Sequence, residues 1–389
     1  MPMTAFPLPS DPLALDAALE AIPNRPAVFL LWAGSGEPYL ARTNVLRRRL
    51  AKLLGTTDKP GKSLNLRGTV ERLEYQLTGS TLESQFVLLQ QARLHLGPDY
   101  RNAVRLRMPP YVKLILTNRF PRTQVARQLG RAKALYFGPF RNRSTAAKFE
   151  SEFLDLFQLR RCQEDLLPAP QHPGCIYGEM GKCLRPCQEA VGVGEYRTEA
   201  DRVREFLHTA GKSLLQVVGA ARERASEDLD FEAAAMMHHR YGRVETVLSF
   251  SDEMARDVEA LQAVAVLPSS VPETIVLGWV RGGYWQGTEM LELAIADGRT
   301  MSLDTRLREA VQRVGASAVP EERAEQLAII ARWFYSTWRD GEMLLFDSWE
   351  KFPYRKLVNA VSRVAQGKKE KPPKPRPNNR SSEPDLTPI

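Results

Sequence analysis

The sequence predicts a modular α+β protein, and three features of the chain indicate this fold class. Short apolar and alternating runs typical of strands occur in two separate regions, near residues 28–41 and 263–280. A proline-punctuated segment that contains every cysteine, 162–187, lies between these regions. Apolar residues at helical spacing follow from Val203 onward. We therefore expect several small units, each with its own core.

The individual elements follow from local patterns. The run 28–32 and the segment 39–41 flank Gly34-Ser35-Gly36, which predicts a hairpin, and Asn44 is expected to cap a basic helix that begins at Val45. The remaining predictions are a helix over 82–96, a strand over 112–116, a turn over 136–140, a helix over 145–157, a helix through 203–214, a helix starting near Ser226 or Asp228, strands over 263–267 and 274–280, and helices over 322–337 and 354–364.

These elements group into five segments. The last segment is rich in lysine and proline and is expected to be disordered. The expected boundaries are 1–105 for a hairpin-and-helix domain, 106–195 for a basic block with the cysteine segment, 196–252 for a helical hairpin, 253–366 for a mixed α/β domain and 367–389 for the basic tail.

Positive charge is concentrated in one part of the chain. The chain has a net charge of +8, and the stretch from Arg101 to Lys148 contains twelve Lys or Arg residues and no Asp or Glu. Such a stretch suits a polyanion, although a solvated basic surface is the ordinary interpretation. We expect double-stranded DNA as the partner. The candidate phosphate contacts are Arg47, Arg48, Arg119, Arg122, Arg141 and Arg143.

The chain shows no pattern for export or membrane insertion. Residues 1–21 lack a charged-then-apolar signal sequence, and no run of about eighteen apolar residues occurs. We therefore expect a cytoplasmic protein without a membrane partner. In that reducing compartment, four cysteines are better explained as metal ligands than as disulfides.

The N-terminal hairpin resembles a GIY-YIG nuclease domain of the UvrC family. The matching stretches are Pro26-Ala27-Val28-Phe29, Glu37 to Arg42 and Leu46 to Leu50. The resemblance implies a metal-dependent nuclease site. The positions that match the family's site residues are Phe29, Tyr39, Arg42, Arg49, Gln90 and Asn102.

Two of these positions depart from the family's chemistry. The family uses a carboxylate to hold Mg²⁺ or Mn²⁺ and a tyrosine to help activate water, but this chain has Gln90 and Phe29 there. An amide lacks the negative charge that a hard cation prefers, and phenylalanine lacks the hydroxyl. Glu83 is the nearest substitute carboxylate on the same helix. We expect strand incision to be lost or impaired.

The cysteines form the most specific pattern in the chain. Cys162, Cys175, Cys183 and Cys187 have intervening gaps of 12, 7 and 3 residues. Four thiolates suit a zinc ion or an iron–sulfur cluster, and buried free thiols are the third possibility. In spacing and in neighbouring residues the segment resembles the iron–sulfur segment of UvrC, which implies a [4Fe-4S] cluster.

A helix near residue 227 resembles the UVR motif, through which UvrC and UvrB recognise one another. Glu227 to Ala235 carries the match, and an ordinary amphipathic core helix is the alternative. The resemblance implies a UvrB-like partner for the helix 227–250. The contacts that it implies involve Phe231, Ala234, Ala235 and Met237.

The resemblance to UvrC covers residues 23–250 and is poor beyond 290. We therefore expect a shortened UvrC-like or Cho-like protein of nucleotide excision repair, in which strand incision is the family activity. One alternative is a non-catalytic DNA-binding adaptor or regulatory paralogue. Another is a zinc-stapled RNA-binding or structural protein.

Overall fold

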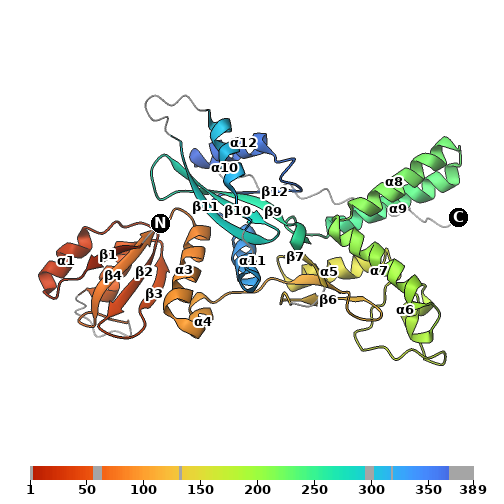
Figure 1. Cartoon of the computed structure of the whole chain (residues 1–389), viewed down its shortest axis with the longest axis horizontal. Coiled ribbons are helices and arrows are strands. Elements are labelled where there is room, and N and C mark those ends of the chain that lie inside the picture. Colours follow the sequence, from red (N-terminus) through yellow and green to blue (C-terminus); the bar gives the residue numbers. More distant parts are fainter. Residues whose placement is uncertain (1–2, 56–63, 131–133, 294–301, 317–318, 368–389) are drawn as a thin grey trace, which may run out of the picture.

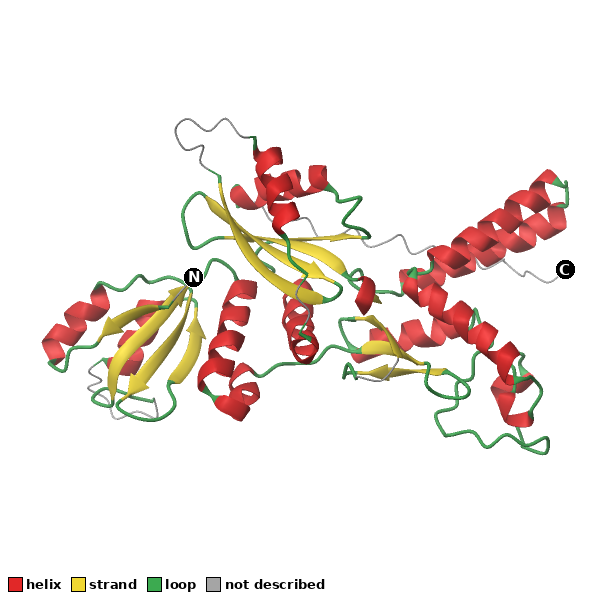
Figure 2. Ribbon diagram, viewed as in Figure 1, coloured by secondary structure: helices red, strands yellow, loops and turns green. Residues whose placement is uncertain are grey.

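The computed structural model describes residues 3–55, 64–130, 134–293, 302–316 and 319–367. Within these residues the chain forms three antiparallel four-stranded sheets with helices packed around them, which confirms the α+β class (Figures 1 and 2). The predicted basic tail lies, after Gly367, outside the described residues. No helix in the described part is long and apolar enough to cross a membrane.

The first sheet contains the predicted hairpin. Strands 28–32 and 39–41 were expected, and the structure confirms both as an antiparallel pair, β2 and β3. Two further strands and an early helix were not predicted. The sheet has the order β1-β4-β2-β3, with bounds β1 Thr4–Pro7, β2 Ala27–Ala33, β3 Tyr39–Thr43 and β4 Val70–Leu77, and it is accompanied by α1 Pro12–Glu20 and α2 Leu46–Leu54.

The two faces of this sheet belong to different cores. Phe29 and its neighbours at alternate positions pack against α1 and α2. Val28 points to the opposite face and packs against α3, Thr81–His95. Arg42 pairs in register with Val28, so it lies on the α3 face as well. The hairpin therefore presents different side chains to two separate environments.

Helix α2 begins without the expected asparagine cap. Its N-cap residue is Val45, which makes no side-chain capping bond, so the prediction for Asn44 was wrong by one position. The segment before β2 supplies the missing acceptors instead. The Leu46 N–H donates to the Arg25 carbonyl at 3.1 Å, and the Arg48 N–H donates to Asn24 Oδ1 at 3.3 Å.

The middle sheet has the order β6-β5-β7-β8. The predicted strand 112–116 is confirmed as β5, but 136–138 belongs to a strand rather than to a turn. Helix α5 begins at Arg143, with Asn142 as its cap, and ends at Leu154. Its buried face stacks Phe149 on Phe137 at 5.0 Å. The strand bounds are β5 Tyr111–Ile115, β6 Arg122–Ala126, β7 Ala134–Gly138 and β8 Arg256–Asp257.

Helices follow the cysteine segment, and two of them form an arm that projects from the body (Figure 1). The helix predicted through 203–214 is two helices, because the chain turns at Gly211, where φ is +83°. The helix expected to start near Ser226 or Asp228 begins instead at Phe231, with Asp230 as its cap. The bounds are α6 Ile176–Glu179, α7 Val193–His208, α8 Lys212–Glu227 and α9 Phe231–Ser249.

The C-terminal sheet has the order β11-β10-β9-β12. Both predicted strands and both predicted helices are confirmed, whereas β11, β12 and α10 were not predicted. Helices α10 and α12 cover one face of the sheet, and α11 covers the other. The bounds are β9 Gln262–Pro268, β10 Thr274–Arg281, β11 Tyr284–Glu292, β12 Glu342–Phe346, α10 Leu303–Arg313, α11 Pro320–Phe334 and α12 Tyr354–Ala365.

Helix α11 also packs against the N-terminal unit, and a buried carboxylate lies at this contact. Only 2% of the Glu325 side chain is exposed. It accepts hydrogen bonds from Arg93 on α3 at 2.5 Å, from the Tyr100 hydroxyl on α4 (Tyr100–Val104) at 2.7 Å, and from Arg101 at 3.0 Å. Burial opposes its ionisation, but these hydrogen bonds outweigh burial and lower the pKa of Glu325 below its ordinary value.

Replacing Glu325 tests this contact. Glu325→Gln should lower the free energy of unfolding by about 1–3 kcal/mol at neutral pH, because the partly exposed Arg93 and the largely exposed Arg101 lose a charged acceptor. A carboxyl with a lowered pKa stabilises the fold above its unfolded pKa of about 4.3, and this stabilisation is lost as the pH falls below it. The difference between the variant and the wild type should therefore shrink in acid. Urea unfolding followed by tryptophan fluorescence at several pH values measures it.

The matched control is Glu322→Gln. Glu322 also pairs with Arg93, but 36% of its side chain is exposed, so its loss should cost less than about 1 kcal/mol. Equal losses for the two variants, or a loss for Glu325→Gln that does not vary with pH, would show that the buried carboxylate does not hold this contact.

Candidate functional site

Three of the predicted nuclease-site residues meet on the α2 face of the first sheet. Phe29 is fully buried, and its ring centroid lies 6.2 Å from that of Tyr39. Arg49 on α2 donates from Nη2 to the Tyr39 hydroxyl at 3.1 Å. The hairpin and the helix that follows it thus bring a phenol and a guanidinium together, with an apolar ring at the first position.

The other predicted residues lie elsewhere. Arg42 is on the α3 face, where its Nε and Nη2 can donate to the Gln85 side chain at 3.1 and 3.0 Å when the amide of Gln85 is oriented with its oxygen toward them. Gln90 is exposed on α3, on the side of that helix turned away from Gln85. Asn102 is exposed on α4. The structure therefore does not bring Arg42, Gln90 or Asn102 to Tyr39 and Arg49.

The substitute carboxylate, Glu83, is engaged in capping the start of a helix. Ser80 Oγ accepts from the Glu83 N–H at 3.1 Å, and Glu83 Oε2 accepts from the Gly79 N–H at 2.8 Å. This reciprocal arrangement is a variant of the capping box at the start of α3. Burial raises the pKa of Glu83, although the backbone hydrogen bonds oppose it. Glu83 stabilises α3 and does not face Tyr39.

The chemistry open to this site is limited. Tyr39 and Arg49 can hold a phosphate through a hydroxyl and a charged fork. Nothing in the described chain forms a group of three or more His, Cys, Asp or Glu side chains that could hold a metal ion. Phosphodiester hydrolysis also needs a group to activate water. The described residues around Tyr39 therefore place a hydroxyl and a guanidinium where a phosphate could be held.

The four cysteines lie near one another but not in a closed ligand set. Cys183 and Cys187 are buried, Cys162 is half-buried and Cys175 is exposed. Burial raises the pKa of Cys183 to about 11; a hydrogen bond from the Arg185 N–H opposes this, and the charges of the other three cysteines add to it. The thiols are thus close enough to act on one another electrostatically. In the part of the chain that the structure describes, three or more of these thiols do not come together as a group that could hold a metal ion.

Arg160, next to this segment, has a structural role that the sequence analysis did not predict. Only 2% of it is exposed, which is rare for arginine. It donates to the carbonyls of Phe120 at 3.0 Å and Glu164 at 2.9 Å, and to Cys162 Sγ at 3.4 Å. Arg160 therefore ties the cysteine segment to the loop between β5 and β6.

The predicted phosphate contacts occupy varied surroundings. Arg47 donates to the Ile22 carbonyl at 2.8 Å, whereas Arg48 is exposed on α2. Arg122 donates to Gln163 at 2.7 Å, and Arg119 lies over the Phe120 ring at 5.4 Å. Arg141 and Arg143 are exposed at the start of α5, where both line a cleft.

The arm carries the predicted partner residues. Phe231 is 73% exposed and Ala235 is exposed, whereas Ala234 and Met237 are half-buried. Two other apolar side chains in the same region, Leu229 and Met236, are 70% and 60% exposed. The end of the arm where α9 begins therefore presents apolar surface to solvent.

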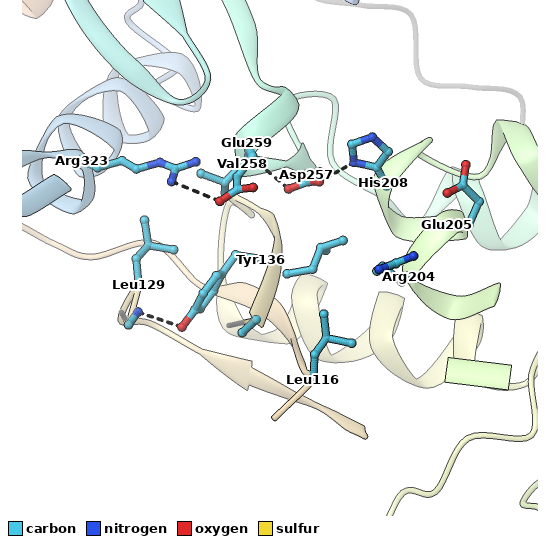
Figure 3. A pocket seen from close by; sticks show the side chains of 13 residues that line it. Leu116, Leu129, Tyr136, Arg204, Glu205, His208, Asp257, Val258, Glu259 and Arg323 are labelled. Carbon is cyan, nitrogen blue, oxygen red and sulfur yellow. Dashed lines mark hydrogen bonds and ion pairs between the residues drawn. The ribbon is translucent and has the colours of Figure 1, made fainter. Parts of the chain in front are cut away.

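A separate cleft of about 640 Å³ lies where α7, the middle sheet and the segment before β9 meet (Figure 3). His208 Nδ1 lies 2.6 Å from Oδ2 of the buried Asp257, which fixes the orientation of the imidazole. Arg204 and Arg323 line the cleft together with Glu205 and Glu259. The sequence analysis did not predict this cleft. The cleft has both positive and negative side chains, so its charge does not favour binding of a polyanion.

Comparisons with known proteins match the chain to one family. Residues 110–206 match the family described as UvrC/Cho excinuclease, middle domain. UvrABC system protein C of Moorella thermoacetica is 26% identical over 339 residues, which cover 85% of this chain and 54% of that protein. UvrABC system protein C of Lachnospira eligens is 25% identical over 298 residues, which cover 74% of this chain and 48% of that protein.

The chain is a UvrC-like protein. It spans about half the length of the curated relatives that it matches. No solved structure matches it. The middle-domain match includes the cysteine segment and most of the arginine-rich stretch, so the central part of this UvrC-like chain carries the family assignment.

Proposed function

We propose that this UvrC-like chain is a DNA-binding protein of nucleotide excision repair whose hairpin site does not incise DNA, or does so only weakly. The observation that carries this proposal is the pairing of Tyr39 with Arg49 beside Phe29, which has no hydroxyl. The site keeps groups that bind phosphate and lacks groups that generate a nucleophile. A non-catalytic adaptor or regulatory paralogue fits this proposal equally well.

The separation of the site residues supports the proposal further. Arg42 lies on the opposite face of the sheet from Tyr39, and Gln90 points to solvent. A metal-dependent nuclease needs a carboxylate-held Mg²⁺ or Mn²⁺ beside the scissile phosphate, together with a cation that stabilises developing charge. Arg49 is placed to act as such a cation, but the described residues form no group of three or more His, Cys, Asp or Glu side chains that could hold the metal.

We also propose that the four cysteines bind a metal centre, a [4Fe-4S] cluster in the first instance and zinc in the second. Cys162, Cys175, Cys183 and Cys187 would hold it. The centre would supply folding free energy to a loop-rich segment in which the described helical structure is limited to α6 and one short 3₁₀ turn, 186–188. The spacing of the four cysteines and the burial of Cys183 and Cys187 support this assignment.

The arm formed by α8 and α9 is proposed as the docking surface for a UvrB-like partner. Phe231, Leu229 and Met236 present apolar side chains at its outer end. A clustered group of large apolar side chains in solvent is typical of a protein–protein interface. Ala234 and Ala235 lie beside them on α9 and leave room for close helix packing.

A nicking assay tests the catalytic part of the proposal. With supercoiled damaged DNA and Mg²⁺ or Mn²⁺, the wild type should nick no faster than Arg49→Ala. Phe29→Tyr combined with Gln90→Glu should add little, because position 90 faces solvent. Robust nicking by the wild type that Arg49→Ala abolishes would overturn the proposal, since it would require a nucleophile-generating group that the site is argued to lack.

Metal analysis tests the cysteine proposal. Protein purified without oxygen should be brown, absorb near 400 nm and contain about four irons per chain. Cys183→Ser should remove the iron and lower the unfolding temperature. The control is Ser213→Ala, which changes a hydroxyl on α8 outside the segment. If the protein contains one zinc per chain, the zinc assignment is right and the [4Fe-4S] assignment is wrong. If the protein contains no metal and Cys183→Ser leaves its stability unchanged, both assignments are wrong.

Partner capture tests the arm. Phe231→Ser combined with Met236→Ser should abolish binding to a UvrB-like protein measured by interferometry, because the apolar contact surface is removed. Both side chains are exposed, so the melting temperature should stay unchanged. Ile176→Ser, at an exposed apolar residue on α6, is the control. Unaltered binding by the double variant would place the interface elsewhere.

A further inference from the structure

Two adjoining clefts form a basic groove where the N-terminal unit, the middle sheet and α11 meet. The larger cleft has a volume of about 890 Å³ and the smaller about 400 Å³. They share Arg107 and Arg332, so they form one continuous groove. The arginines that line this arginine groove are Arg42, Arg105, Arg107, Arg127, Arg141, Arg143 and Arg332.

The charge of the arginine groove is of one sign. No Asp or Glu lines either cleft, and none of the seven arginines forms an ion pair within the described residues. Many other arginines of the chain are paired, such as Arg313 with Glu289 and Arg243 with Glu152. Asp252 and Glu150 partly offset the charges of Arg141 and Arg143. Guanidinium groups along a concave surface that no carboxylate lines still produce a positive local potential.

Contributions from distant parts of the chain create this concentration of charge. Arg42 comes from β3, Arg105 and Arg107 from the segment after α4, and Arg332 from α11. Desolvation in the cleft and then the positive charge of Arg332 lower the pKa of Arg42 from its ordinary value. The N-terminal and C-terminal units therefore place like charges close together, and a bound anion would relieve that repulsion.

We propose that the arginine groove binds the sugar–phosphate backbone of a single nucleic acid strand, with Arg107 and Arg332 at its centre. This inference rests on the proposed DNA-binding function and assigns it a surface and a strand state. Duplex DNA is read by elements that protrude into its grooves, whereas a single strand lies in a positively charged channel. Clefts of 890 and 400 Å³ suit the second mode.

The lining also predicts how the strand is held. Phe140 is fully buried, and the Arg141 guanidinium lies over the Tyr335 ring at 5.3 Å. Neither aromatic ring is free to stack on a base. Binding should therefore depend on phosphate contacts, vary little with sequence and weaken steeply with salt.

Fluorescence anisotropy with labelled single-stranded DNA of about 16 nucleotides and with the matching duplex tests this inference. Arg107→Glu combined with Arg332→Glu should weaken single-strand binding about tenfold or more, since two charged contacts become repulsive. It should also lower the salt slope by about 1.4, or about 0.7 for each lost phosphate contact. Duplex affinity should change less than the single-strand affinity.

Two matched variants separate charge from folding. Arg332→Lys keeps a positive charge and should retain most single-strand binding. Arg355→Glu reverses an exposed arginine on α12, which covers the far face of the C-terminal sheet, and should leave binding unchanged. Arg107 and Arg332 are both exposed, so the double variant should melt at the wild-type temperature.

The outcomes are distinguishable. If the wild type binds DNA and the double variant binds both substrates as well as the wild type does, the groove inference is wrong while the proposed function stands. If the double variant loses duplex and single-strand affinity equally, the groove is not selective for a single strand. If the wild type binds neither substrate at any salt concentration, the proposed DNA-binding function itself fails.

Discussion

Glu325 lies almost completely buried between helices of two units, and the arrangement of the central part of the molecule depends on it. Its carboxylate accepts hydrogen bonds from Arg93, Tyr100 and Arg101. A buried charge is tolerated only when it is fully paired, so α11 has one well-defined position against α3 and α4. Phe86 stacking on Trp285 at 4.2 Å adds an apolar contact to the same junction.

This junction has consequences for function. Arg332 follows Glu325 by seven residues on α11, so the docking that satisfies Glu325 also carries Arg332 to the mouth of the cleft beside Arg42. Strand β3 of the hairpin thus lines one side of the arginine groove. Under the proposed function, phosphate binding and nuclease chemistry separate, because Arg42 and Arg49 are present while Phe29 and Gln90 stand where the resembled family has a hydroxyl and a carboxylate.

Local patterns predicted much of the fold. The apolar run 28–32 with its glycine turn predicted a hairpin, alternation predicted β5, and short apolar runs predicted β9 and β10, because these signals depend on a few adjacent residues. Strand β1 is short and mostly exposed, so it has no apolar pattern to reveal it. The helix expected through 203–214 has continuous apolar spacing, and the positive φ angles of Ala210 and Gly211 reveal that it is divided.

The candidate site was less predictable, for a physical reason. Arg93 and Glu325 are 232 residues apart, and no local pattern indicates that they pair. Arg332 likewise resembles an ordinary surface arginine of an amphipathic helix until the fold places it near Arg107. The position of Gln90 shows the converse. Its residue type indicates a poor metal ligand from the sequence alone, but its direction on α3 depends on which face packs against the sheet.

Chemical footprinting of arginines tests the central claim most directly. The protein would be modified with phenylglyoxal, with and without saturating single-stranded DNA, and the modified arginines quantified by mass spectrometry. DNA should protect Arg107 and Arg332 together, although they come from different units, and should leave Arg355 as reactive as in the free protein. Protection confined to Arg119 and Arg122, with Arg107 and Arg332 fully reactive, would contradict the account.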